Sequence, residues 1–236
     1  MKKILNAKFW VSIAIIIIWA YYTYPADLTD MQKTAYLNSF LMTLELTIGG
    51  IVIGIILGFF LAFLKTLGIR LLSFIIDEYI DIIRGTPVLL QLMIFAFVIM
   101  ATFSDNFYAA IIALGLNSSA YVAEIVRSGI NSVDKGQMEA ARAMGLNYGV
   151  AMKEVVLPQA IKNILPALAN EFIILFKETS VVGLIGIFDL TMQSKSLQAV
   201  LFTPEPILFA GAVYYASVKF FSLLARLLEK RLNRHD

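Results

Sequence analysis

The chain of 236 residues is 59% hydrophobic and only 15% charged, and its mean hydropathy is +0.80. A soluble domain is roughly 45–50% apolar and about 25% charged, so a soluble fold of this size would leave much apolar surface in water. This composition excludes a cytosolic enzyme, a disordered tail and a nucleic-acid-binding module. It predicts an integral membrane protein surrounded by the lipid bilayer.

The residue types needed for several common chemistries are missing. The chain has no cysteine, and its single histidine, His235, is one residue from the C-terminus. This excludes a disulfide, a thiol nucleophile, a His-based triad and an HExxH metal site. The GxxxxGK[ST] phosphate loop is also absent. We therefore expect no catalytic residue, no metal ligand and no cofactor, and a chain that is not itself an enzyme.

Six stretches are apolar enough to be membrane spans, each of which needs about 20 mostly apolar residues. They are 9–26, 40–64, 87–103, 107–130, 164–187 and 206–228. The first follows a basic start without a small-residue cleavage site, which favours an uncleaved helix over a signal peptide. The mixed segment 71–84 is expected at the interface, and the short span after it is expected to begin there. The sequence predicts an all-α polytopic helical bundle of about six spans.

The basic residues orient these spans. Thirteen Lys and Arg residues lie in one alternate set of segments, 1–8, 65–86, 131–163 and 229–236. Only two lie in the other set, 27–39, 104–106 and 188–205. By the positive-inside rule the first set is cytoplasmic, so a multi-pass protein with both termini in the cytoplasm is predicted.

The fourth predicted span carries a polar stripe at helical spacing. Its members are Asn117, Tyr121, Glu124 and Ser128. Arg127 follows Glu124 by three residues and is placed to pair with it. Because an ionisable group in a membrane helix is costly, we interpret Glu124 as part of a solute pathway. For Asn117 and Ser118, hydrogen bonding between helices is an equal alternative.

The fifth predicted span is even more polar. Its 13 strongly apolar residues favour insertion by roughly 5 kcal/mol, whereas each of its three central charged residues costs roughly 3 kcal/mol. It therefore requires polar partners or a water-filled cavity. The candidate pathway residues on its polar side are Asn170, Glu171, Lys177 and Glu178. The alternative interpretation is an ion pair that joins two helices.

Small residues follow one face of the second predicted span. Thr43, Thr47, Gly50 and Gly54 form a mild stripe, and Gly58 continues the small-xxx-small pattern. Such a pattern lets another helix approach closely, so packing is the favoured interpretation. Glu45 lies off this stripe near the expected outer end, where its carboxylate can reach water.

The polar, helix-forming segment 131–162 is the one long soluble stretch inside the chain. It contains Glu139-Ala140-Ala141, then Gly145 after three residues, and Val155-Val156-Leu157-Pro158 after nine more. This resembles the EAA loop of bacterial ABC importer permeases and departs only in having Val155 in place of Ile. Three further runs, in order, resemble the branch of that family that imports histidine, glutamine, glutamate, arginine and opines. They are Arg84-Gly85-Thr86-Pro87, Ser119 to Glu124, and Leu165-Pro166 with Asn170 to Ile173.

The residues of this loop also suit a docking element on physical grounds. We expect Glu139 to begin a short amphipathic helix, the two alanines to allow close docking, and Gly145 to permit a sharp turn. Pro158 is expected to mark a bend before the next membrane helix. Apolar contacts for a partner are expected from Met138, Met144, Leu146 and Met152.

The resemblance runs from about Thr34 to Leu232 and implies a complete set of partners. These are ATP-binding cassette ATPase subunits, a second permease that is identical or paralogous, an extracytoplasmic binding protein and a polar amino acid. The ATPase-coupling residues that it implies are Glu139, Ala140, Ala141, Gly145, Leu157 and Pro158. The implied location is the bacterial cytoplasmic (inner) membrane.

The same resemblance divides the chain into three parts. Residues 1–33 form an added N-terminal helix and outer linker, because family members have five spans, whereas 34–232 form the transmembrane domain and 233–236 a cytoplasmic tail. Two other functions are considered. One is a secondary transporter in which Glu171 or Glu124 carries a proton or ion. The other is an intramembrane hydrolase, which the missing His and Cys residues disfavour.

Overall fold

The computed structural model describes residues 2–232, with side chains described from Trp10 onward, so His235 and the predicted tail 233–236 lie outside it. Every regular element in this range is helical, which confirms the all-α prediction. The α-helices are α1 (Lys2–Thr23), α2 (Asp30–Thr66), α3 (Arg70–Gly85), α4 (Val88–Ile94), α5 (Asn106–Asn131), α6 (Lys135–Ala143), α7 (Tyr148–Ala151), α8 (Leu157–Glu178), α9 (Leu190–Leu201) and α10 (Glu205–Leu232). Two π-helices, η1 (Phe95–Ile99) and η2 (Met152–Val156), and the 3₁₀-helix η3 (Thr179–Ile185) complete the chain.

Three of the described helices, α2, α5 and α10, are long and apolar enough to cross a membrane. A fourth span exists only if α3 and the α4–η1 segment are counted together, and these are bent by 104°. The expectation that one helix runs from the mixed segment into 87–103 is therefore wrong. The reason is Pro87, which has no N–H group and forces Thr86 into an extended conformation (φ −110°, ψ 141°).

The first and fifth predicted spans were expected to be full membrane-crossing helices, and the structure differs in both. The apolar part of α1 among the described side chains, Trp10–Thr23, is shorter than a full crossing. In the fifth predicted span, the α-helix ends at Glu178 and a 3₁₀-helix follows. The segment 188–205, expected to be a simple connection, contains α9.

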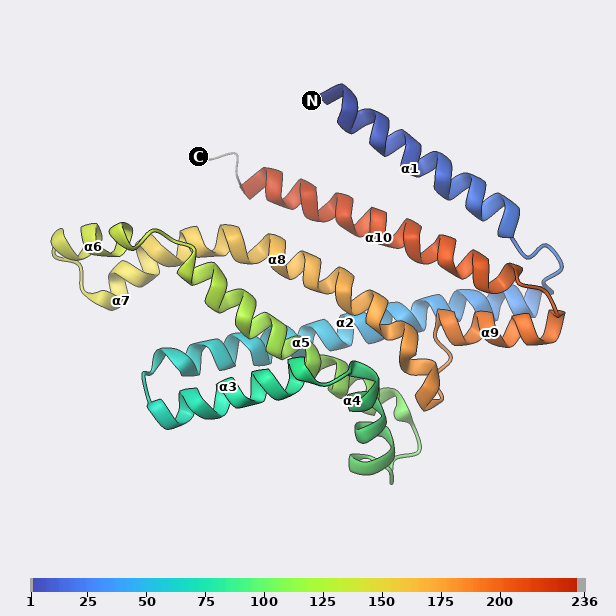
Figure 1. Cartoon of the computed structure of the whole chain (residues 1–236), viewed down its shortest axis with the longest axis horizontal. Helices are drawn as coiled ribbons and strands as arrows, with labels where there is room; N and C mark the ends of the chain where they lie inside the picture. The colour runs from blue at the N-terminus through green and yellow to red at the C-terminus, as the bar shows by residue number, and fades with distance from the viewer. Residues whose placement is uncertain (1, 233–236) are drawn as a thin grey trace.

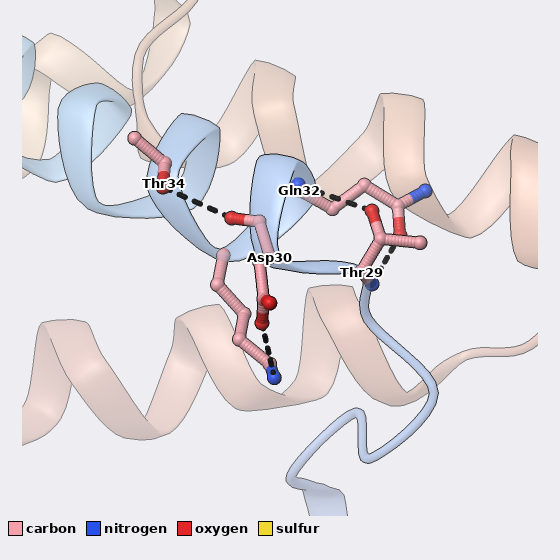
Figure 2. A network of polar contacts seen from close by, with 5 residues as sticks. Thr29, Asp30, Gln32 and Thr34 are labelled. Carbon is pink, nitrogen blue, oxygen red and sulfur yellow. Dashed lines mark hydrogen bonds and ion pairs between the residues drawn. The ribbon is translucent and has the colours of Figure 1, made fainter.

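Helix α2 begins well before the predicted span. Thr29 Oγ1 accepts a hydrogen bond from the Gln32 amide (3.3 Å), and Gln32 Oε1 accepts one from the Thr29 amide (2.9 Å). Figure 2 shows this reciprocal capping box together with Asp30 and Thr34 in the first turn. The 37 residues of α2 span about 55 Å, so the helix is longer than the roughly 30 Å hydrocarbon layer.

The core is the contact between α2 and α5. A Cβ atom added at Gly54 would lie 2.7 Å from Ser118 Cβ, and one added at Gly58 would lie 2.6 Å from Val122 Cβ. Gly115 of α5 lies equally close to Ile53 of α2. The packing interpretation of the small-residue stripe is thus confirmed, because only glycine permits these distances.

Figure 1 shows how the helices are arranged around this core. Helices α1 and α10 are antiparallel neighbours, and the start of α1 and the end of α10 lie toward the side that carries α6, α7 and the turn between α2 and α3. The α1–α2 link and α9 lie on the opposite side. Helix α1 contacts α10 through Trp19, whose ring lies 6.3 Å from that of Tyr215 and directly over Gly211.

Candidate coupling loop and transport pathway

The segment 131–162 forms a helical hairpin. Helix α6 begins at Lys135, where the Asp134 carboxylate caps it by accepting a hydrogen bond from the Gly136 amide (2.7 Å). The expectation that Glu139 begins this helix is therefore wrong. Glu139 lies in the middle of α6 and is exposed. The capping carboxylate that determines the helix start, that of Asp134, is five residues before Glu139.

The sharp turn expected at Gly145 is confirmed. Its backbone is left-handed (φ +89°), a conformation that is strained for residues with a side chain. The Gly145 amide donates to the Arg142 carbonyl (3.0 Å), and the Leu146 amide donates to the Ala141 carbonyl (3.2 Å). Asn147 then caps α7 by accepting from the Val150 amide (2.9 Å). These bonds fix the angle between the two arms of the hairpin.

The two alanines of the loop face opposite ways. Ala141 is buried, whereas Ala140 is exposed. Among the four apolar residues expected to contact a partner, only Met144 is fully exposed, at 82%. Tyr148 and Val150 are also exposed, although the sequence did not single them out. The sequence signal that could have identified these two residues is their position just after Asn147, a residue type that caps helices.

The chain does not leave the helical conformation at Pro158. The π-helix η2 directly precedes α8, and Pro158 lies in the first turn of α8, where its missing N–H has little cost. The change from π- to α-helix falls at Leu157, directly before Pro158, and the bend expected at Pro158 stays a prediction. Consequently α7, η2 and α8 form one helical run that connects the loop to the membrane part. Leu157 on this run is half-buried.

Three consecutive residues of α5 form a polar junction inside the bundle. Asn117 Nδ2 donates to Glu178 Oε2 (3.0 Å), and Ser118 Oγ donates to Glu171 Oε1 (2.9 Å). Ser119 Oγ lies 2.8 Å from the hydroxyl of Tyr79 on α3. Glu171 is only 2% exposed. These bonds join α5 to α8 and α3. Asn117 and Ser118 therefore form hydrogen bonds between helices, and their acceptors are two of the predicted pathway carboxylates.

The other predicted pathway residues lie apart from this junction. Glu124 pairs with Arg127 on α5, as expected, and lines a cavity of about 290 Å³. Lys177 is exposed and lines a cavity of about 410 Å³ between α8, α9 and α10. Asn170 is exposed beside α10. Within residues 10–232, no ion pair involves Lys177 or either glutamate of α8, so the ion-pair alternative has no support there.

A family comparison identifies this architecture. The profile described as "Binding-protein-dependent transport system inner membrane component" matches residues 50–234. The chain belongs to this family. The resemblance to ABC importer permeases drawn from the EAA pattern is thereby confirmed, and the chain is a helical membrane permease.

Curated relatives of the permease have the same character. It is 42% identical over 212 residues to the arginine transport system permease protein ArtQ of Bacillus subtilis (strain 168). The alignment covers 88% of this chain and 97% of the relative. It is 35% identical to the glutamine transport system permease protein GlnP of Escherichia coli (strain K12), over 81% of this chain and 90% of the relative. Both relatives are matched over more of their own length than of this chain.

Solved structures agree with this fold. A crystal structure of an amino acid ABC transporter with histidines matches with a TM-score of 0.80 and 42% identity, over 84% of this chain and 94% of that one. An inward-facing structure of the MetNI methionine ABC transporter matches with a TM-score of 0.74, over 88% of this chain and 100% of that one. At 19% identity, the second match indicates the shared fold of the permease alone.

Proposed function

We propose that the permease forms the transmembrane pathway of an ABC importer for a polar amino acid, and that the 131–162 loop couples this pathway to separate ATPase subunits that hydrolyse ATP. The observation that carries the proposal is the hairpin itself. It presents Glu139, Ala140 and Met144 at one end of the bundle and continues through one helical run into α8. A displacement of the hairpin by an ATPase is therefore transmitted to the helix that carries Glu171 and Glu178.

The remaining partners follow from the same family. A second permease, identical or paralogous, completes the pathway, and an extracytoplasmic binding protein delivers the amino acid. In this arrangement residues 34–232 are the transmembrane domain, 1–33 are an added helix and linker, and both termini are cytoplasmic. The family description and the arginine and glutamine transport names of the relatives support this assignment.

The cavity beside Lys177 is the best candidate for a solute site. Its volume of about 410 Å³ is in the range of small-ligand pockets, roughly 300–1,000 Å³. Ser180, Thr191 and Tyr214 also line it and add hydroxyl groups to the Lys177 ammonium. A zwitterion that loses water needs opposite charges and hydrogen-bond partners. Lys177 and Ser180 can supply them for its carboxylate, whereas the hydroxyls of Thr191 and Tyr214 lie 3.2 Å from each other. Glu124, Asn170, Glu171 and Glu178 are proposed to act elsewhere along the pathway.

Two variants of Gly145 test the coupling role. Gly145→Val strains the left-handed turn and reorients the hairpin, whereas Gly145→Asn keeps it, because asparagine tolerates this conformation. The permease is co-expressed with its partner ATPase and binding protein, and ATPase co-purification and ATP-driven uptake in vesicles are measured. We expect Gly145→Val to lose at least tenfold in both and Gly145→Asn to stay within about threefold.

Two outcomes would contradict the proposal. Unchanged co-purification in Gly145→Val would show that the hairpin does not hold the ATPase. Uptake by vesicles that contain the permease without any ATPase, driven by an ion gradient, would identify a secondary transporter instead.

A further inference from the structure

The break between α3 and α4 has no part in the coupling loop or in the candidate solute cavity. It occupies the run Arg84-Gly85-Thr86-Pro87, and the two helices that flank it meet at 104°. Together, α4 and η1 have twelve residues and rise about 18 Å, which is too short to cross the hydrocarbon layer alone. The chain therefore enters the bundle through α3, turns sharply, and continues as a short irregular helix.

This turn leaves backbone carbonyl groups without helical partners. The Ile83 carbonyl would normally accept from the amide four residues later, but that residue is Pro87, which has none. Thr86 is extended, so its own carbonyl also points out of the helical pattern. Carbonyl groups exposed in this way persist inside a membrane protein only where another protein group satisfies them.

The side chain of Gln91 satisfies them. Its Nε2 atom donates to the Ile83 carbonyl (2.8 Å) and lies 3.2 Å from the Thr86 carbonyl and 2.9 Å from Thr86 Oγ1. Carbonyl oxygens accept only, so the contacts fix which end of the amide faces the break. Thr86 Oγ1 in turn donates to the Ile82 carbonyl (2.9 Å). Gln91 is 6% exposed, and its Oε1 atom is buried without a partner.

The break is connected to the rest of the bundle on both sides. On the α3 side, Arg84 lies 5.4 Å from the ring centre of Tyr121 on α5, and Tyr79 bonds to Ser119 in the polar junction. On the α4 side, Leu92 and Ala96 are buried in the same apolar cluster as Leu175 of α8. A rotation at the break would therefore displace helices that carry the predicted pathway residues.

We infer that Gln91 is a positioning residue for transport: its side-chain amide locks the α3–α4 break, and so holds α4 and η1 as a rigid wall of the pathway. Interrupted helices line the substrate path in many transporters because their free backbone groups need a cavity or a protein partner. Here the partner is a single buried amide. The lock follows from the geometry, whereas its role in transport rests on the proposed function.

The lock is tested by distance measurements across the break. Because the chain has no cysteine, Leu71→Cys and Val98→Cys carry two spin labels without further changes, and both positions are exposed. In the assembled complex we expect a narrow distance distribution. Gln91→Met, which keeps the size but removes the donor, should broaden it at least twofold, and Thr86→Val should broaden it less. Gln159→Met is the matched control for the distance measurement alone, since that amide donates to the Val155 carbonyl in the coupling loop and the distance distribution across the break should stay unchanged.

Transport in the same variants tests the positioning role. Gln91→Met should reduce ATP-driven uptake at least tenfold while the complex still assembles. Gln91→Glu should be as defective when charged, because a carboxylate only accepts, and should partly recover at lower pH as its protonated form donates one hydrogen bond. Gln91→Met should not recover.

The distance and uptake measurements test the lock, its role in transport and the proposed function separately. An unchanged distance distribution in Gln91→Met would overturn the lock, and a broadened one with normal uptake would overturn its role in transport. A native complex that imports no amino acid would overturn the proposed function without affecting the distance result.

Discussion

Lys177 shows how one residue acquires a candidate role only through its surroundings. In the sequence it is one of three charges in a membrane helix, and the interpretation is divided between a pathway and an ion pair. In the structure it faces a cavity with three hydroxyl-bearing neighbours, and no described carboxylate pairs with it. Glu171, by contrast, is buried and bonded to Ser118. Helical spacing alone could not distinguish these two environments.

The proposed role of Lys177 has a kinetic consequence. Lys177→Gln removes the cation while keeping much of the side chain, so binding of the solute carboxylate should weaken. We expect the KM for uptake to rise about tenfold, equivalent to about 1.4 kcal/mol, with little change in the maximal rate. Lys195→Gln on α9, also an exposed lysine, is the control. Equal KM values in both variants would exclude Lys177 from the solute site.

At the scale of elements, glycine spacing predicted the α2–α5 contact well. The pattern Gly50, Gly54 and Gly58 indicates a close helix neighbour, and α5 is that neighbour. The sequence did not indicate which helix would fill this position, because any small-residue face suffices. It also missed the 104° break, because the helix of the short apolar stretch 87–103 was expected to begin in the mixed segment before Pro87. Only the proline itself was a signal there.

The α2–α5 contact should be sensitive to a single methyl group. Gly54→Ala places a Cβ atom 2.7 Å from Ser118 Cβ, which forces the helices apart and should destabilise the permease by about 1–3 kcal/mol. Thermal unfolding in detergent measures this as a lower Tm. Gly85→Ala is the control, because nothing lies within 4 Å of its Cβ position. If the Tm of Gly54→Ala equals that of the unsubstituted permease, the α2–α5 contact is looser than described.

At the scale of the whole molecule, the charge count and the helix arrangement agree on which segments share a side. The start of α1, the end of α10 and the α6–α7 hairpin lie toward one side of the bundle (Figure 1), and all belong to the basic set of segments. By the positive-inside rule, we propose that this side is cytoplasmic. On this proposal, an added N-terminal helix changes the side of the N-terminus without moving the coupling loop.

Single cysteines in this cysteine-free chain test that orientation. A membrane-impermeant maleimide should label Tyr148→Cys only from the cytoplasmic side, and Phe202→Cys only from outside; both native residues are exposed. Asp27→Cys, just after α1, should be labelled from outside if α1 crosses the membrane. Labelling of Asp27→Cys from the cytoplasm, with the other two as expected, would mean that α1 does not cross.

The sequence by itself determined that this is an all-α membrane protein and that 131–162 carries the EAA pattern, and it predicts which segments lie on the cytoplasmic side. These features depend on composition and spacing, which act locally along the chain. Only the tertiary structure decided that α5 fills the glycine face of α2, and that Asn117 and Ser118 donate to Glu178 and Glu171. The reason is physical: a buried donor or a glycine contact takes its meaning from atoms far away in sequence. No local pattern specifies which those atoms are.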